Sequence, residues 1–268
     1  MVKLKRILAL SLTFLLALVG VGCNSSTTSE QTKKITVAAS QVPHAEILEH
    51  VKPSLKKEGI DLEIKVMQDY VLPNRVVEEG EVDANFFQHI PFLEETNQKN
   101  GYHLVKVTGV HIEPLGGYSK KVKKIEDLPK GSTIAVPNDP TNLTRALLLL
   151  DAHGVIQLDN RQGEKTERNV KDLKSHKLKP VEAALLPRVL DEVDLAVINT
   201  NYALQAKLNP VKDSLIIEDK NSPYVNILVT KQGKEKDEAI QKLAKALNSP
   251  EVKKFIEDKY KGSVVPAF

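Results

Sequence analysis

The stretch ITVAASQVPHAEILEHVKPSLKKEGIDLEIKV, residues 35–66, indicates the fold most directly. Residues 35–39 form an apolar run that predicts a buried strand. Residues 43–57 are predicted to form a helix, which Gly59 ends because glycine tolerates the left-handed conformation that often follows a helix. Residues 62–66 alternate apolar and charged side chains and predict a second strand. This order of elements is typical of an α/β protein with parallel strands.

The same alternation continues along the rest of the chain. Further strands are expected over residues 82–86, 103–107, 132–136, 178–181, 195–198 and 224–229. Pro180 favours a sheet edge for one of them, because proline cannot donate a hydrogen bond to a neighbouring strand. Helices are expected after Pro73 and over residues 91–99, 140–152, 182–190, 234–247 and 250–260. We therefore expect mainly parallel sheets with helices on both faces.

Two parts of the chain resemble each other weakly. Residues 82–85 read VDAN and residues 193–196 read VDLA, so each places an Asp at the start of an apolar stretch. We expect two α/β lobes that close on a solute, with lobe 1 formed by residues 34–112 plus 229–268 and lobe 2 by residues 113–228. Ligands of such folds bind at the carboxyl ends of the strands. Asp83 and Asp194 are interpreted as strand-start residues, with an acid–base pair as the alternative.

The N-terminus has the pattern of an export signal. Lys3, Lys5 and Arg6 precede an almost unbroken apolar run over residues 7–21, which is too short for a typical membrane span. Gly22 and Cys23 follow, and Cys23 is the only cysteine, so it cannot form an internal disulfide. We interpret residues 1–22 as a signal peptide and Cys23 as a lipid acceptor, although Gly20 replaces the Leu usual three residues before that cysteine. Cleavage elsewhere, which would leave a free thiol, is the alternative.

The segment after Cys23 and the charge balance limit the other possibilities. Residues 24–32 contain no apolar side chain, so residues 23–33 are expected to form a flexible tether. Of the 38 basic residues, three precede Cys23, whereas none of the 35 acidic residues does. The remaining chain is therefore formally neutral, which argues against nucleic acid as a partner.

The strongest local group of polar residues is NDPTNLTR, residues 138–145. Asp139 can cap a helix that begins at Pro140, and the free N–H groups of a helix start attract anions. Asn142 and Arg145 are three residues apart and share a helical face, where an amide and a guanidinium could hold a carboxylate. The alternative is an ordinary helix start with Arg145 in solvent.

A second group, NFFQHIPF over residues 85–92, combines three aromatic side chains with His89 between a strand and a helix. Aromatic residues are only 4% of the chain, so their clustering here indicates an apolar pocket wall that would suit a thioether. Asn199 ends a predicted strand and Asn226 lies within another. Their amides could hold an amino acid's ammonium or carboxylate, or could simply satisfy the backbone.

Signals for catalysis or metal binding are weak. The chain has no Gly-x-Ser-x-Gly sequence and no P-loop. Its histidines are scattered and lack the spacing of a zinc site. We therefore expect no enzymatic activity, no cofactor and no metal.

Several of these motifs, in this order, resemble the bacterial methionine-binding lipoproteins of the ABC methionine importer. The similar segments are residues 70–74, 83–93, 117–121, 135–143, 196–199 and 222–226. The resemblance implies a two-lobe periplasmic-binding-protein fold of type II, with methionine between the lobes. It implies that Tyr70, Phe87, His89 and Phe92 surround the ligand side chain, that Asn142 and Arg145 take the carboxylate, and that Asn199 and Asn226 take the polar amino-acid end. Phe92 replaces a Tyr common in this motif, which removes one hydroxyl.

The resemblance also implies partners and a location. Methionine or a close analogue would be delivered to a membrane permease driven by a cytoplasmic ATPase. The lipid at Cys23 would hold the protein at the extracytoplasmic face of a bacterial membrane. The alternative ligands are a methionine-containing dipeptide or another small amino acid, and a metal-ion receptor is the alternative of a different class.

Overall fold

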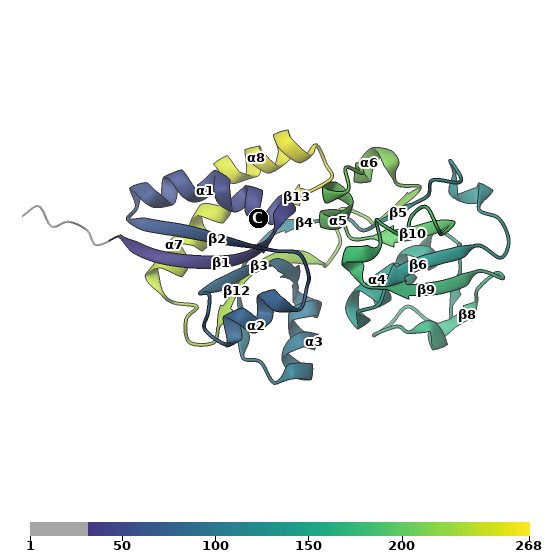
Figure 1. The fold of residues 1–268 in the computed structure, drawn as a ribbon, viewed down its shortest axis with the longest axis horizontal. Helices are drawn as coiled ribbons and strands as arrows, with labels where there is room; N and C mark the ends of the chain where they lie inside the picture. Colours follow the sequence, from purple (N-terminus) through teal and green to yellow (C-terminus); the bar gives the residue numbers. More distant parts are fainter. Residues whose placement is uncertain (1–31) are drawn as a thin grey trace, which may run out of the picture. The chain divides into compact units, whose positions relative to one another are not determined.

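The structure, a computed structural model, describes residues 32–268, and these residues form one compact unit. The expected signal peptide, the expected lipidation at Cys23 and the expected tether up to residue 31 lie outside the described residues. The described chain contains a six-stranded sheet in the order β13-β4-β12-β3-β1-β2 and a five-stranded sheet in the order β11-β5-β10-β6-β9 (Figure 1). Each sheet is the centre of one lobe.

The first lobe is built from both ends of the described chain. Its elements are β1 (Lys33–Ser40), α1 (Glu46–Lys57), β2 (Ile60–Met67), α2 (Leu72–Glu78), β3 (Ala84–His89), α3 (Ile90–Asn100), β4 (Leu104–Ile112), β12 (Val225–Lys231), α7 (Glu238–Leu247), α8 (Pro250–Tyr260) and β13 (Val265–Pro266).

The second lobe is formed by the middle of the chain. Its elements are β5 (Gly116–Tyr118), β6 (Thr133–Pro137), α4 (Pro140–Ala152), β9 (Lys177–Val181), β10 (Leu195–Ile198), α5 (Thr200–Gln205), α6 (Pro210–Asp213) and β11 (Ile216–Ile217), with the separate hairpin of β7 (Gln157–Leu158) and β8 (Val170–Asp172).

Both sheets are mixed, rather than mainly parallel as the sequence led us to expect. In the first sheet β1 pairs in parallel with β2 and β3, whereas β12 is antiparallel to both β3 and β4. Strand β12 returns from the second lobe and inserts between strands that run the opposite way. It joins the first sheet from Val225 onward, so residues 225–228, which the sequence assigned to lobe 2, pair within the sheet of lobe 1.

Helices cover both faces of each sheet, as expected. On one face of the first sheet, α1, α7 and α8 bury a core that includes Leu48, Leu243 and Ile256. On the other face, Val76 of α2 and Leu93 of α3 pack against the same sheet. The second sheet has one core under α4 and another that includes residues of α5. Burial of these apolar side chains, each contributing roughly 1.5–3 kcal/mol, is the main stabilisation of the lobes.

The two weakly similar segments make the same kind of contact, in which an Asp before a strand accepts a hydrogen bond from the backbone of the neighbouring strand. Asp83 precedes β3, and its Oδ2 accepts a hydrogen bond of 2.7 Å from the backbone N–H of Thr36 in β1. Asp194 precedes β10, and its Oδ2 accepts one of 2.8 Å from the backbone N–H of Thr133 in β6. The two carboxylates serve different sheets, so they act as strand-start residues and not as an acid–base pair.

Two predictions about local structure had opposite outcomes. The helix expected over residues 182–190 is wrong: only a short 3₁₀ helix over Ala183–Leu185 forms, followed by turns. Pro187 explains this, because it lacks the N–H and its ring clashes with the preceding helical turn. The edge position expected from Pro180 is confirmed, since β9 is the last strand of its sheet.

Within residues 32–268, no helix is both long and apolar enough to span a membrane.

Candidate functional site

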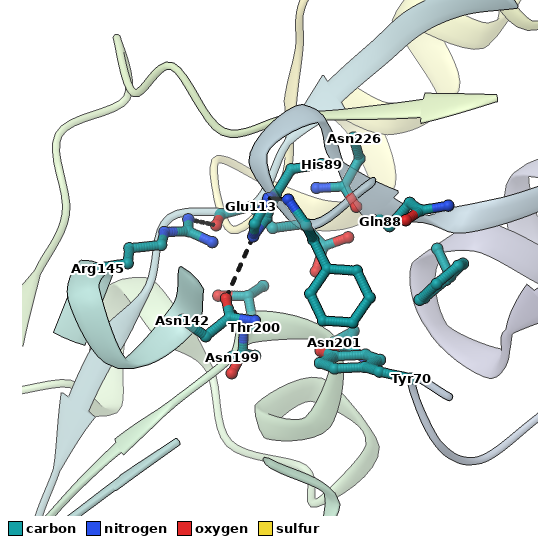
Figure 2. Close-up of a pocket in the computed structure, with 12 residues that line it drawn as sticks. Tyr70, Gln88, His89, Glu113, Asn142, Arg145, Asn199, Thr200, Asn201 and Asn226 are labelled. Carbon is teal, nitrogen blue, oxygen red and sulfur yellow. Dashed lines mark hydrogen bonds between the residues drawn. The ribbon is translucent and has the colours of Figure 1, made fainter. Parts of the chain in front are cut away.

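One cavity, with about 340 Å³ of empty space, is lined by residues of both lobes (Figure 2). All eight residues predicted from the sequence to bind ligand line it, together with four that were not predicted. In Figure 2, Arg145 lies on one side of the cavity and Tyr70 on the opposite side. The lining residues are Tyr70, Phe87, Gln88, His89, Phe92, Glu113, Asn142, Arg145, Asn199, Thr200, Asn201 and Asn226.

His89 is fixed at the end of β3, where α3 begins. Its Nδ1 accepts a hydrogen bond of 3.2 Å from the backbone N–H of Phe92, so His89 caps the helix. The other ring nitrogen, Nε2, therefore carries the proton and donates to Asn142 Oδ1 at 3.2 Å. Burial, followed by repulsion from Arg145, lowers the pKa of His89 to about 3, so the ring is neutral at neutral pH. Both nitrogens are engaged, and a ligand meets an uncharged ring.

The start of α4 holds Asn142 in place. Asp139 accepts from the backbone N–H of Asn142 at 2.9 Å and from its side-chain Nδ2 at 2.9 Å, which confirms the predicted cap. Asn142 Oδ1 accepts from His89 of the first lobe and from Asn199 Nδ2 of the second, the latter at 2.9 Å. Asn142 is therefore a fixed junction between the two lobes.

Arg145 is 3% exposed, so the alternative of a solvent-facing Arg145 is wrong. Its Nε donates to both carboxylate oxygens of Glu218, at 3.0 and 3.1 Å, and its Nη2 donates to the same carboxylate. Nη2 also donates to the backbone carbonyl of Glu113 at 2.6 Å. Glu113 lies in the segment between β4 and β5, and Glu218 lies in the segment between β11 and β12. The Arg145 guanidinium therefore contacts both segments that connect the two lobes.

Glu113 is a buried carboxylate surrounded by neutral donors. Its Oε1 lies 2.8 Å from Nε2 of His111 and 3.2 Å from Nε2 of His44. Burial lowers the pKa of His44 to about 4 and that of His111 to about 3, so neither ring is charged at neutral pH. Burial also raises the pKa of Glu113. The neutral hydrogen-bond donors around the carboxylate therefore offset only part of the cost of burying its charge.

The Glu113 network also orients Asn226. His44 Nε2 faces Glu113 Oε1, an acceptor, and must therefore carry the proton that it also shares with Asn226 Oδ1 at 3.0 Å. The carbonyl oxygen of this amide is thus held by the protein, and its NH₂ group remains as the donor. Asn226 can offer hydrogen bonds to a ligand, but its oxygen is already engaged.

The convergence of His44, His111 and Glu113 was not foreseen from the scattered histidines, and these three residues have ligand atoms within 4.8 Å of one another. Such a group could hold a metal ion. However, Nδ1 of each histidine is buried without a hydrogen-bond partner among the described residues. Histidines that bind a metal nearly always donate their second N–H to an acceptor. The hydrogen-bond network around Glu113 therefore explains the cluster better than a metal centre does.

The opposite end of the cavity is aromatic. The ring centroids of Tyr70, Phe87 and Phe92 are 5.8 Å apart in each pair. The Tyr70 hydroxyl donates to Asn201 Oδ1 at 2.5 Å, which links the first lobe to α5 of the second. Phe92 offers no hydroxyl here, so this end is apolar apart from the Tyr70–Asn201 pair.

One acceptor on the cavity wall is unused. Asn199 Oδ1 is buried and has no hydrogen-bond partner among the described residues, although its Nδ2 donates to Asn142. A buried carbonyl oxygen without a donor costs roughly 1–3 kcal/mol. A ligand that brings an N–H group to this oxygen would remove that cost.

Sequence reasoning missed Gln88, Glu113, Thr200 and Asn201. Gln88 belongs to a buried amide network, in which its Oε1 accepts from Asn74 Nδ2 at 2.9 Å. Glu113 follows β4 directly, and an acidic residue at the carboxyl end of a strand indicates a possible ligand-binding residue. The extended segment was predicted to end at residue 107, so this signal was not recognised.

Known proteins share both the sequence and the fold. Residues 35–268 match the protein family described as NlpA lipoprotein. The methionine-binding lipoprotein MetQ of Bacillus subtilis is 41% identical over 98% of this chain and 99% of its own length. A nutrient-binding protein from Burkholderia cenocepacia, whose structure was solved bound to methionine, is 43% identical with a TM-score of 0.84, over 87% of this chain and 100% of that one.

A third similar protein points to the same class. An ABC transporter periplasmic substrate-binding protein from Coxiella burnetii is 36% identical with a TM-score of 0.83, over 87% of this chain and 100% of its own. The two-lobe α/β fold predicted from the sequence is thus the fold of periplasmic substrate-binding proteins. With a family match over nearly all of the described residues and relatives above 40% identity, this chain belongs to the NlpA lipoprotein family.

Proposed function

We propose that this protein captures methionine between its two lobes and delivers it to an ABC importer, while a lipid on Cys23 holds it at the extracytoplasmic face of the membrane. The observation that carries the proposal is the division of one cavity into an aromatic end and a charged end. Methionine has the same division, with an apolar thioether at one end and a zwitterion at the other. The relatives named as methionine-binding support the choice of ligand.

We assign the thioether to Tyr70, Phe87 and Phe92, with the neutral ring of His89 beside them. Sulfur packs favourably at the edge of aromatic rings, with about 0.3–1.5 kcal/mol for each contact. Phe92 stands edge-on to Tyr70 and to Phe87, at interplanar angles of 70° and 83°.

The carboxylate is assigned to Arg145, Asn142 and Asn226. Arg145 contacts its protein partners through Nε and Nη2, so Nη1 is the nitrogen we assign to the ligand. The oxygen of Asn142 and that of Asn226 are each held by a histidine, so only N–H groups remain for the ligand. Asn226 keeps its NH₂ group, whereas Asn142 uses one N–H for Asp139 and keeps the other. This arrangement favours an anion at this position.

The α-ammonium is assigned to Glu113 and to Asn199 Oδ1. Among residues 32–268, the Glu113 carboxylate is contacted by the neutral rings of His44 and His111, with the charge of Arg145 nearby, and Asn199 Oδ1 has no hydrogen-bond donor. A ligand ammonium supplies the missing cation to the first and the missing hydrogen bonds to the second. Asn199 and Asn226, which the sequence assigned together, thus take opposite parts of the amino acid.

Closure of the lobes is the proposed transport signal. Direct bonds such as His89–Asn142 and Tyr70–Asn201 connect the lobes, and a ligand held by both would favour that state. The permease, driven by its cytoplasmic ATPase, would recognise the closed form. We propose lobe 1 as residues 34–112 plus the C-terminal part of the chain from β12 onward, and lobe 2 as the part between them.

The proposal is tested with the full-length lipoprotein purified in detergent. Mass spectrometry of the protein prepared without added ligand should detect methionine. After unfolding and refolding to remove that ligand, calorimetry should show methionine binding one to one, and binding should be much weaker for leucine and for glutamate. Absence of methionine binding by the refolded, compact protein would refute the proposal.

A further inference from the structure

Tyr224 lies just outside the cavity, in the segment that links β11 to β12. Its ring centroid lies 4.5 Å from Cζ of Arg145 and 5.0 Å from the ring centroid of His89. Arg145 and His89 both line the cavity, whereas Tyr224 does not. The Tyr224 ring therefore packs on the side of these two residues that faces away from the cavity.

Two surface grooves meet at this ring. One, with about 730 Å³ of empty space, is lined by Arg145, Leu148, Glu218 and Tyr224 among others. The second, with about 780 Å³, lies between α3 and α4 and has Gln98, Thr141 and Tyr224 in its wall. Tyr224 lines both grooves, and Arg145 lines both the first groove and the cavity. The Tyr224 ring is thus part of the partition between the charged end of the cavity and the outside.

We infer that Tyr224 restricts the site to ligands that end in a free α-carboxylate, and that it excludes peptides extended from that carboxyl group. The inference rests on the proposed function, which places the ligand carboxylate at Arg145. A residue added through a peptide bond at this carboxyl group must continue past Arg145. The Tyr224 ring packs against the Arg145 guanidinium at this point, and the two side chains together separate the cavity from the first groove.

Removal of the ring should therefore join the cavity to the grooves. Tyr224→Ala removes the ring from the partition, whereas Tyr224→Phe keeps the ring and removes only the hydroxyl. Tyr224→Leu keeps apolar packing against His89 with a smaller side chain, and it provides the test if the Ala variant does not fold. Conversion of the carboxylate to an amide also removes the negative charge, so charge and size must be separated.

The experiment compares four ligands by calorimetry on the ligand-free, full-length lipoprotein in detergent. Methionine is the reference, methionyl-glycine extends the carboxyl side, and glycyl-methionine extends the amino side. Methioninamide removes the charge without adding a residue. We expect methionyl-glycine to bind the wild-type protein at least about 100-fold more weakly than methionine, because both shape and charge oppose it.

In Tyr224→Ala the ratio of methionyl-glycine to methionine affinity should rise by about tenfold or more. The ratios for methioninamide and for glycyl-methionine should stay within about twofold of wild type, as should all ratios in Tyr224→Phe. A folded Ala or Leu variant with an unchanged ratio for methionyl-glycine would overturn the inference, and so would wild-type protein that binds methionyl-glycine as tightly as methionine. Failure of wild type to bind methionine at all would instead refute the proposed function.

Discussion

Replacement of Glu113 by Gln should weaken methionine binding selectively, through the α-amino group. The carboxylate is buried, and within the described part of the chain its hydrogen-bond donors are neutral groups, with His111 Nε2 at 2.8 Å as the shortest contact. The amide keeps nearly the same shape and can still accept from a histidine, but it carries no charge to attract an ammonium.

The expected magnitude follows from the burial of the pair. Loss of one partner of a buried, hydrogen-bonded charge pair costs about 2–5 kcal/mol. Some of that cost is absent here, because the amide oxygen can still accept one hydrogen bond from the ligand. We therefore expect a loss of roughly 2–3 kcal/mol, which corresponds to a 30- to 150-fold weaker affinity.

The assay is calorimetry with methionine and with 4-(methylthio)butanoic acid, which lacks the amino group. The variant should bind the desamino acid at least as well as the wild-type protein does, because that ligand leaves the Glu113 charge uncompensated. Glu192→Gln is the matched control, since the Glu192 side chain is 66% exposed and pairs with Lys179 on the surface. An equal loss of affinity for both ligands would show that Glu113 acts on the structure and not on the ammonium.

Four further predictions concern other parts of the protein. Arg145→Ala should weaken methionine binding by about 2–4 kcal/mol in calorimetry and also lower the melting temperature, because Glu218 loses its partner; unchanged affinity would rule out the assigned role. Tyr70→Phe should weaken methionine binding by about 1 kcal/mol, because the hydrogen bond to Asn201 is lost, and the melting temperature should change little. An unaltered rate of methionine dissociation would contradict this prediction. The free energy of unfolding, measured with urea, should fall as the pH drops from about 6.5 toward 4. The reason is that the buried His44, His89 and His111 bind protons more readily in the unfolded chain, and each contributes roughly 3 kcal/mol at most. A free energy of unfolding that does not change over this pH range would show that the fold does not hold these histidines neutral. Cys23→Ser should release the protein from the membrane fraction and abolish labelling by a fatty-acid analogue, whereas continued labelling would place the lipid elsewhere.

The sequence by itself determined the features that depend on neighbouring residues. The cap at Asp139 and the helix that begins at Pro140 involve groups within three residues of one another, and the structure has them as predicted. The alternation of strands and helices likewise follows from local apolar patterns. The helix predicted over residues 182–190 does not form, because Pro187 prevents a helix that the apolar spacing around it would otherwise favour.

Family motifs also pointed to eight residues that line one cavity, although no local pattern says that Tyr70 and Arg145 lie around the same space. What the motifs lacked was the orientation of each group. The tautomer of His89 depends on the backbone of Phe92, and the direction of the Asn226 amide depends on His44 and Glu113. The contacts of Asn226 join residues far apart in the sequence. The contact of His89 with Phe92 depends on the path of the backbone at the start of α3.

Only the tertiary structure decided which charges are buried and what faces them. Glu113 is an ordinary acidic residue in the sequence, and only the fold brings His44 and His111 to its carboxylate, in the segment that leads from β4 to the second lobe. The mixed order of the sheets has the same origin, since β12 inserts between β3 and β4 after more than a hundred intervening residues. Burial and long-range pairing are properties of the folded chain, because the cost of a buried charge depends on every group that surrounds it.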